Sequence, residues 1–453
     1  MKIINPATEE VIRDIEADSS DSIQEKYNAT KIAQKDWAAR PLKERINCIA
    51  KFNELMLANA DSIAADLTSE VGKPLNQAKG EISGGIGRSQ YFVENSEKYL
   101  SDEWMVSEGD TKEKITYEPL GIIANISAWN YPVLVGMNVF IPALIGGNAV
   151  MYKPSEFSTL TGINMAEMLY EAGVPKDIFQ VVIGAKEAGE ALLELPLDGY
   201  FFTGSHQTGR YIAERVASKL VPVGLELGGK DPMYVCEDVD VISAAAAGVE
   251  GAFYNNGQSC CAVERIYVHE KIYDQYVSAF LEEVKSMRMG SPTEEGTFLG
   301  PLTRSAQISV LEDQVSDAVA KGGKLQLGGS RIDGKGYYFE PTVLSNVDHS
   351  MKVMMDESFG PIIGIQKVAN DEDAIKLMLD TPYGLTSAVY TQDQVRAENI
   401  MDQMHSGNVY WNCCDRVSPN IPWSGRGNSG LGSTLSHAGI RAFVQPKSYH
   451  LRG

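Results

Sequence analysis

Cysteine is scarce in this chain. The 453 residues hold six cysteines and six histidines, and two pairs of cysteines are immediate neighbours, Cys260 with Cys261 and Cys413 with Cys414. Adjacent cysteines close a disulfide only in a strained geometry, so this set is a poor framework for a secreted protein. We therefore expect a reducing, cytoplasmic setting, and without histidines near these pairs we expect no metal site.

An excess of positive charge is also lacking. Lys and Arg number 40 against 60 Asp and Glu, which leaves a net charge of −20. Such a field repels nucleic acid phosphates and anionic membrane surfaces, so we expect no nucleic acid and no membrane as a partner. The acidity is typical of a solvated surface and identifies no substrate.

No apolar run is clean enough to predict a membrane span. The best candidate, residues 121–152, is interrupted by Asn125, Asn130, Pro132 and Pro142. A buried strand, loop and helix fit this stretch better. The first residues, MKIINPATEEVIRD, carry acidic residues and a proline where a signal peptide needs an apolar segment, so we expect the mature protein to begin near Met1.

What is present is an α/β pattern long enough for two or three domains. One helix is predicted to begin after Ser158 or Thr159 and to stop at Gly173 and Pro175. The predicted strands cover residues 122–126, 149–152, 180–183, 200–203 and 223–225 in the first half and 232–236, 265–269, 362–368, 387–391 and 408–411 in the second. We expect two α/β lobes with a cleft between them, and nucleotide binding in the first lobe.

Two segments compete for the role of phosphate site. Gly425–Gly430 matches the dinucleotide pattern GxGxxG, but it follows prolines near the C-terminus and lacks the strand and βαβ unit that the pattern needs. Phe202–Gly209 is better placed, because a strand ends there in small residues and a helix begins. A helix N-terminus offers amide donors to a pyrophosphate, although ordinary N-capping by Ser205 explains the same residues.

A nucleophile and a base can be proposed from local context. Cys260 follows a polar, glycine-containing loop and precedes a strand, so it could face a cleft, although many buried cysteines are inert. Glu226 is a lone carboxylate at an apolar strand end, where it must be paired, protonated or at a cleft. A structural salt bridge from Glu226 to Lys230 is the competing explanation.

Seven motifs in order resemble the aldehyde dehydrogenase superfamily over nearly the whole chain. They are PLG (119–121), WNYP (129–132), KPSE (153–156), FTGS (202–205), ELGGK (226–230), GQSC (257–260) and ESFGP (357–361). The resemblance implies a Rossmann-like NAD-binding domain (1–100 and 120–228), an α/β catalytic domain (229–432) and a small β oligomerisation element (101–119 and 440–453). A homodimer or a homotetramer is expected.

The resemblance also implies the chemistry. Cys260 attacks an aldehyde, while the Asn130 side chain and the Cys260 backbone N–H stabilise the oxyanion. Hydride transfer leaves a thioester, which water activated by Glu226 releases as the acid. A CoA-acylating enzyme and a non-catalytic structural protein on the same fold remain alternatives, and the presence of Glu226 favours water over a thiol.

Cofactor contacts carry over from the same motifs. Lys153 and Glu156 are expected at the adenosine ribose, Ser205 at the pyrophosphate, and Glu357 with Phe359 at the nicotinamide ribose. Because Glu156 would repel a 2′-phosphate, NAD is favoured over NADP, although both can be accommodated. The full expected set is Ser127, Ala128, Trp129, Lys153, Glu156, Gly184, Gly204, Ser205, Leu227, Glu357 and Phe359.

The substrate pocket is expected to contain Tyr131, Tyr254 and Trp423 as aromatic walls with Asp415 nearby. Aromatic faces and a carboxylate can hold an ammonium, which resembles betaine aldehyde and aminoaldehyde dehydrogenases. Asn138 stands where those relatives often have tryptophan, and the same walls suit an apolar or aromatic aldehyde. Succinic semialdehyde is a weaker candidate, since Arg416 is the one carboxylate clamp the motifs place.

Overall fold

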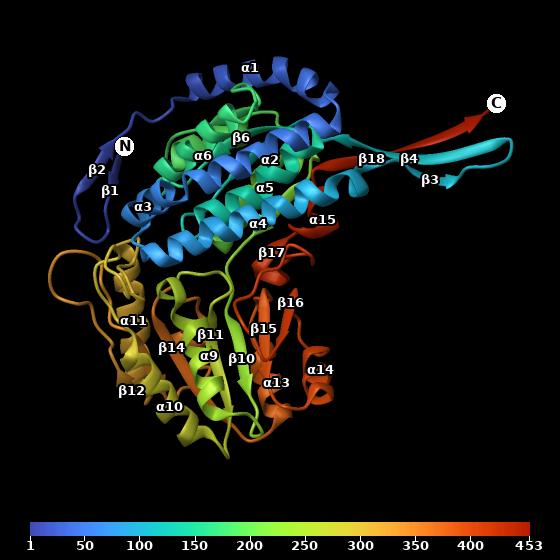
Figure 1. Cartoon of the computed structure of the whole chain (residues 1–453). Coiled ribbons are helices and arrows are strands. Elements are labelled where there is room, and N and C mark those ends of the chain that lie inside the picture. The colour runs from blue at the N-terminus through green and yellow to red at the C-terminus, as the bar shows by residue number, and fades with distance from the viewer.

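The computed structural model describes residues 1–453 and contains two large sheets, a smaller protruding sheet and an N-terminal hairpin (Figure 1). The first large sheet has the order β17-β9-β8-β5-β6-β7, and all its neighbours are parallel except β17 with β9. Its strands are β5 (Ile122–Ile126), β6 (Ala149–Lys153), β7 (Phe179–Val181), β8 (Gly199–Thr203), β9 (Val223–Glu226) and β17 (Gly430–Leu431). The edge strand β17 therefore comes from the range 229–432 that the sequence assigned to the catalytic domain.

Helices cover both faces of this sheet, because each parallel connection must cross over it. The helices are α1 (Ser20–Ala39), α2 (Leu42–Ala58), α3 (Ala60–Val71), α4 (Leu75–Leu100), α5 (Pro132–Gly146), α6 (Thr159–Glu171), α7 (Lys186–Glu194) and α8 (His206–Val216), with a short turn η1 (Ala217–Lys219). Ahead of them lies the hairpin of β1 (Lys2–Ile4) and β2 (Val11–Asp14). No helix is long and apolar enough to cross a membrane.

The second large sheet begins directly after the loop that follows β9. Its order is β12-β13-β14-β11-β10-β15-β16, and only β12 runs antiparallel to its neighbour. The strands are β10 (Asp231–Val235), β11 (Val263–His269), β12 (Lys324–Leu327), β13 (Thr342–Ser345), β14 (Ile362–Val368), β15 (Thr386–Tyr390) and β16 (Asn408–Trp411). The packed helices are α9 (Val241–Phe253), α10 (Tyr273–Ser286), α11 (Ala306–Ala320), α12 (Lys352–Met355), α13 (Asp371–Leu379) and α14 (Gln394–Met401), with turns η2 (Tyr254–Gly257) and η3 (Gly427–Ser429).

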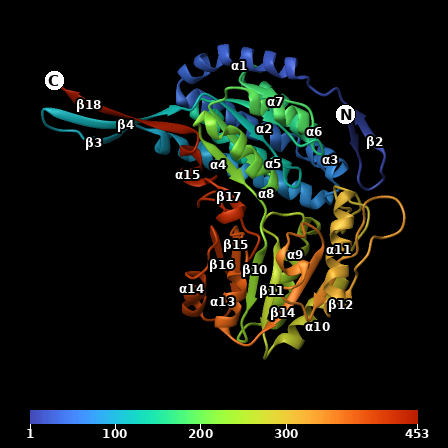
Figure 2. The same cartoon turned by 180° about the vertical axis from the view of Figure 1, so that it is seen from behind.

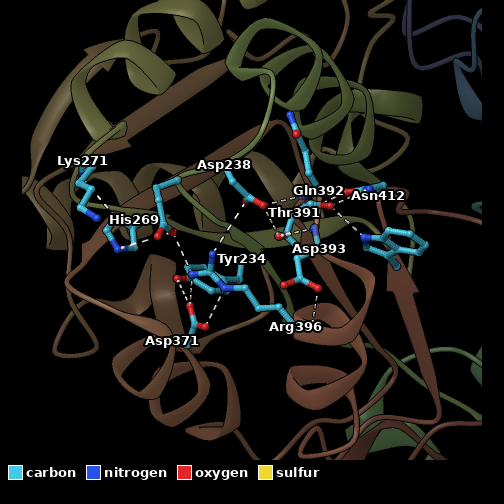
Figure 3. Close-up of polar contacts among 12 residues, drawn as sticks. Tyr234, Asp238, His269, Lys271, Asp371, Thr391, Gln392, Asp393, Arg396 and Asn412 are labelled. Atoms are coloured by element: carbon cyan, nitrogen blue, oxygen red, sulfur yellow. Dashed lines mark hydrogen bonds and ion pairs between the residues drawn. The ribbon is translucent and has the colours of Figure 1, made fainter.

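The parallel strands of the second sheet, all but β12, point their carboxyl ends away from the first sheet (Figure 1). A cluster of polar side chains lies at that far end (Figure 3). Arg396 binds Asp371 at 2.5 Å and Glu237 at 2.9 Å, and Tyr234 donates to Asp371 at 2.8 Å. The amino ends of β10 and β11, beside Asp231 and Val263, face the first sheet instead.

The third sheet projects from the body with the C-terminus at its tip (Figures 1 and 2). It has the order β18-β4-β3, built from β3 (Glu103–Val106), β4 (Thr111–Pro119) and β18 (Val444–Arg452), and α15 (Ser436–Arg441) precedes it. Trp104, Met105 and Leu451 are exposed on this arm. Apolar side chains on a projecting edge are typical of a surface that pairs with another chain.

The predicted strands agree with the observed ones to within one or two residues, and the predicted helix is α6 (Thr159–Glu171). The predicted cap of α6 is wrong. Ser158 occupies the N-cap position but its side chain makes no capping bond. The buried Glu70 carboxylate accepts from the amides of Leu160 at 2.6 Å and Thr161 at 2.8 Å instead, because a charge satisfies two orphan donors at once.

The core of the first domain predicts a measurable cost for truncation. Phe140 is fully buried and meets Tyr152 and Phe179 edge-on at centroid distances of 5.5 and 5.1 Å. Phe140→Ala should cost about 3–5 kcal/mol, because it removes a large side chain from a packed site. Urea unfolding should show a lower midpoint, whereas Ile32→Ala, at a side chain 79% exposed, should leave the midpoint unchanged.

Candidate active site

Cys260 lies between η2 and β11, in a half-buried position. The loop before it is shaped by three consecutive left-handed residues, Asn255, Asn256 and Gly257, with φ of 53°, 57° and 67°. A side chain at Gly257 would meet the Gly360 carbonyl oxygen at 2.4 Å, so only glycine fits there. This tight turn presents Cys260 toward the cleft, as the loop composition predicted.

Asn130 lies in the loop between β5 and α5. Its backbone carbonyl accepts from Lys73 Nζ at 2.7 Å and from Asn255 Nδ2 at 3.2 Å. No protein hydrogen bond engages the Asn130 side-chain amide, and the residue is 4% exposed and lies outside the lining of both cavities described below. The bond from Asn255 joins the loop that bears Asn130 to the loop that bears Cys260.

Lys73 and Glu81 form an ion pair with no solvent exposure beneath the Asn130 loop. Glu81 also accepts from the amide of Val133 at 2.9 Å, at the first turn of α5. The Lys73 ammonium lies 3.8 Å from the centroid of the Tyr131 ring. Burial lowers the pKa of Lys73, and the Glu81 charge opposes that shift. Sequence reasoning missed this pair, since neither residue stands near the motifs along the chain.

Glu226 ends β9 in a half-buried position, outside the lining of both cavities. Thr434 Oγ1 donates to its Oε1 at 3.1 Å, while its Oε2 is enclosed and has no partner. Burial raises the pKa of Glu226 to about 8, against the opposing effect of the Thr434 bond. The competing salt bridge is wrong, because Lys230 pairs with Glu264 at 2.6 Å. Glu226 therefore has no counter-ion and a pKa close to neutral pH, which suits a general base.

A cavity of about 390 Å³ opens at Cys260. The residues predicted for the substrate pocket all line it: Tyr131, Tyr254, Asp415 and Trp423. Cys413 and Cys414 line it as well, as does Asn138. The Asp415 carboxylate is already engaged, since Cys261 Sγ donates to its Oδ1 at 2.9 Å, and burial raises the pKa of Asp415.

Three charged residues of this cavity were missed in the sequence: Glu81, described above with Lys73, and Arg88 and Glu250. Arg88 lies on α4, and a charged residue on a long amphipathic helix is ordinarily a solvated one. The available signal was the glycine-rich run GGIG at 84–87 that precedes it. These glycines bring α4 close to α5, since a side chain at Gly85 would lie 3.0 Å from Val133 Cγ1.

A second cavity, of about 640 Å³, lies on the other side of the loop at 127–131, beyond the carboxyl ends of the first sheet. Seven of the residues predicted to bind the cofactor line it: Ser127, Ala128, Trp129, Lys153, Glu156, Gly204 and Ser205. Ser205 also caps α8 by accepting from the Thr208 amide, so the capping interpretation of the 202–209 segment is confirmed and the phosphate interpretation stays a prediction. The remaining amides of the α8 first turn and the Glu156 carboxylate fit a pyrophosphate and a ribose diol.

Lys153 and two cations missed in the sequence bring positive charge to this cavity. Lys153 Nζ lies 3.9 Å from Glu156 Oε2, and Lys186 and Arg304 line the same cavity. The Arg304 guanidinium lies 5.7 Å from the centroid of the Phe157 ring. The lining therefore combines Glu156, which can accept from hydroxyl groups, and Glu190, which accepts from Tyr211, with several cations for phosphate.

Four residues predicted at the cofactor lie outside the lining of this cavity. Gly184 packs against Ala188, and Leu227 packs beneath Gly209 of α8. Glu357 accepts from the Gly229 amide at 3.0 Å. Phe359 lies edge-on to Trp129 at 5.5 Å, at the boundary of the cavity.

The loop of Glu357 and Phe359 rests on a second fully buried pair. Glu264, paired with Lys230, accepts from the amides of Ser358 at 2.9 Å and Phe359 at 3.0 Å. Burial raises the pKa of Glu357 to about 7. The two loops on either side of the cleft are therefore each held by a buried lysine–glutamate pair.

A cysteine at a small-molecule cavity, separated by one loop from a nucleotide-sized cavity, is the arrangement of a nucleotide-dependent enzyme with a covalent step. The aldehyde dehydrogenase family model matches residues 1–449. The chain belongs to the aldehyde dehydrogenase family, and it oxidises aldehydes to acids with NAD or NADP.

Named relatives agree with this assignment. The chain is 34% identical to aminoaldehyde dehydrogenase 1 of Pisum sativum, over 98% of this chain and 91% of that protein. It is 33% identical to 3,6-anhydro-alpha-L-galactose dehydrogenase of Streptomyces coelicolor, over 100% of this chain and 93% of that protein.

Solved structures share the fold. Lactaldehyde dehydrogenase of Escherichia coli matches with a TM-score of 0.96 and 32% identity, over 100% of this chain and 96% of that one. A betaine aldehyde dehydrogenase of Staphylococcus aureus in complex with NAD+ matches with a TM-score of 0.96 and 29% identity, over 100% of this chain and 94% of that one.

The raised pKa of Glu226 predicts a pH-dependent difference between the protein and Glu226→Gln. The folded protein holds this proton up to about pH 8, while the unfolded chain releases it near 4.5. The wild type therefore loses stability relative to the variant as pH rises between these values, and the difference levels off above 8. Thermal unfolding midpoints at pH 5, 7 and 9 measure it.

Glu97→Gln is the control, because the Glu97 side chain is 61% exposed. Its midpoint should follow the wild type at each pH. A Glu226→Gln midpoint that runs parallel to the wild type from pH 5 to 9 would contradict a raised pKa.

Proposed function

We propose that Cys260 is the nucleophile of this dehydrogenase and that Asn130 supplies the side-chain donor of its oxyanion hole. The observation that carries the proposal is the shared anchoring of the two loops. The Asn130 carbonyl accepts from Asn255, five residues before Cys260, while the Asn130 amide makes no protein bond. An oxyanion donor must be fixed in place and otherwise unengaged, and this arrangement meets both conditions.

In the first half-reaction the Cys260 thiolate adds to the aldehyde carbon, and the carbonyl oxygen becomes an oxyanion that accepts from Asn130 Nδ2 and the Cys260 amide. NAD, when bound, supplies the hydride acceptor. The oxyanion collapses to a carbonyl as the C–H bond breaks with its electron pair, which leaves a thioester on Cys260.

In the second half-reaction Glu226 takes a proton from water, whose oxygen attacks the thioester carbon. The C–S bond breaks, and the acid leaves while Cys260 returns as thiolate. Glu226 suits this step because its Oε2 is enclosed without a partner and its pKa is raised to about 8. The presence of this carboxylate favours hydrolysis over acyl transfer to CoA, and it argues against a non-catalytic role.

NAD is the cofactor we favour. The Glu156 carboxylate lines the cofactor cavity, where it would accept from ribose hydroxyls and repel a 2′-phosphate. Lys186 and Arg304 line the same cavity, and their charges would partly offset that repulsion. NADP is therefore the weaker but usable cofactor.

The carbon chain of the substrate lies against Tyr131, Tyr254 and Trp423. These aromatic walls suit an apolar or aromatic aldehyde body, and the cavity of about 390 Å³ suits a short one. An amine-bearing substrate is the second candidate, supported by the names of the aminoaldehyde and betaine aldehyde relatives and by Glu250 in the lining. Against it, Lys73 already covers the Tyr131 ring, and Asp415 is engaged by Cys261.

We also propose a homo-oligomer, with the arm of β3, β4 and β18 as its contact. Its exposed Trp104, Met105 and Leu451 would be buried against a second copy. A dimer and a tetramer both fit the arm. A reducing, cytoplasmic setting is proposed from the six free cysteines, one of which must stay a thiol to react.

The nucleophile assignment predicts that Cys260→Ala abolishes NADH formation at 340 nm across a panel of aldehydes. Asn130→Ala should lower kcat about 10²- to 10³-fold, the usual loss for one oxyanion donor. Cys48→Ala is the matched control, because Cys48 lies outside both cavities and should keep full activity. Residual turnover by Cys260→Ala would reject the mechanism.

The cofactor assignment predicts that Glu156→Gln shifts preference toward NADP. Removing one charge contact at a partly exposed site is worth about 1 kcal/mol, so the ratio of kcat/KM with NADP to kcat/KM with NAD should rise roughly fivefold. Glu187→Gln, at an exposed position on α7, should leave the ratio unchanged. An unchanged ratio in Glu156→Gln would remove Glu156 from cofactor selection.

A further inference from the structure

Arg88 enters the substrate cavity without a counter-ion. It lines the same cavity as Cys260, and its one hydrogen bond runs from Nη1 to Asn138 Oδ1 at 3.3 Å. Its helix neighbour Glu81 is paired with Lys73 and accepts from the first turn of α5. No carboxylate lies within ion-pair distance of the Arg88 guanidinium.

Other enclosed arginines of this chain are satisfied. Arg265 donates to the carbonyls of Lys230, Leu377 and Met378 at 2.9, 3.1 and 3.1 Å. Arg396 pairs with three carboxylates, Glu237, Asp238 and Asp371, at the far end of the second sheet. A guanidinium carries five N–H donors in a planar fork, and Arg88 uses one of them to donate to the neutral amide oxygen of Asn138. Its remaining donors are free for a molecule in the cavity.

The rest of the lining does not neutralise this charge. Asp415 is engaged by the Cys261 thiol, and Glu250 is exposed to water, which stabilises its charge without a partner. Arg416, at the exposed rim, adds a second cation to the cavity lining. Burial lowers the pKa of Arg88, while the charges of Cys261, Glu81 and Cys260 oppose that shift. An anion in the cavity would relieve the desolvation of this guanidinium.

We infer that Arg88 determines substrate specificity by binding a carboxylate at the end of the substrate opposite its aldehyde group. The inference rests on the proposed function, because the aldehyde carbon must reach Cys260 for the distal group to reach Arg88. The substrate class is then a short semialdehyde: an aldehyde, a few carbons against Tyr131 and Trp423, and a carboxylate. A planar carboxylate matches the guanidinium fork, with Asn138 holding the fork in place.

Three four-carbon aldehydes that differ in their distal group test this inference: succinic semialdehyde, butanal and 4-aminobutanal. Wild-type kcat/KM should be highest for succinic semialdehyde. Arg88→Gln should lower that value roughly 10- to 100-fold, mainly through KM, because it removes a charged hydrogen-bonded contact. The value for butanal should stay unchanged.

Two further variants keep the test independent of folding. Arg88→Lys retains the charge but loses the fork, so it should recover part of the succinic semialdehyde activity. Lys79→Gln removes an exposed cation from the same helix and should change nothing. Succinate, the product, should inhibit the wild type competitively and should inhibit Arg88→Gln more weakly, which measures carboxylate binding without turnover.

Two outcomes overturn the inference and leave the proposed function standing. One is a wild type that oxidises butanal or 4-aminobutanal with a higher kcat/KM than succinic semialdehyde. The other is an Arg88→Gln variant that loses the same factor on all three substrates, which would assign Arg88 to the Cys260 thiolate or to the fold. Turnover that persists in Cys260→Ala would instead overturn the proposed function itself.

Discussion

The active site depends on the backbone carbonyl of Asn130, which connects the loops on its two sides. It accepts two hydrogen bonds, one from the Lys73 ammonium at 2.7 Å and one from the Asn255 side-chain amide at 3.2 Å. The first ties the oxyanion loop to the helical layer of the first domain, and the second ties it to the loop of Cys260. Attack by Cys260 and stabilisation of the oxyanion require the two loops to keep a fixed position relative to each other. The Asn130 carbonyl contributes to this, because it is bonded to both sides at once.

Two buried lysine–glutamate pairs carry this geometry on either side of the cleft. Lys73 with Glu81 supports the oxyanion loop, and Lys230 with Glu264 supports the loop of Glu357 and Phe359. Burying an ion pair has an unfavourable desolvation free energy, and the attraction between the two charges only partly offsets it. In both cases the glutamate also accepts hydrogen bonds from backbone amides, Glu81 at the start of α5 and Glu264 in the loop of Glu357 and Phe359. Each pair therefore fixes the position of the backbone and adds little net stability.

Local patterns predicted the strands, the helix over 159–171 and the reactive loops, because each depends on residues adjacent along the chain. Contacts between distant segments were not predictable in this way. Lys230 stands four residues after Glu226 and suggested a pair, yet the fold turns Lys230 toward Glu264 and leaves Glu226 alone. Glu70 caps α6 from 90 residues away, which the adjacent Ser158 gave no reason to expect.

The net charge of the chain and the charge of Arg88 have opposite signs. The chain carries −20 overall, whereas the substrate cavity contains a guanidinium with no counter-ion. Repulsion from surface carboxylates is screened within about 8 Å at physiological ionic strength, so it weakly affects a small anion until contact. Inside the cavity the nearest charges decide, because the interaction between two charges strengthens as their separation falls. An acidic exterior is therefore compatible with an anionic substrate, provided that selection happens at Arg88 rather than during approach.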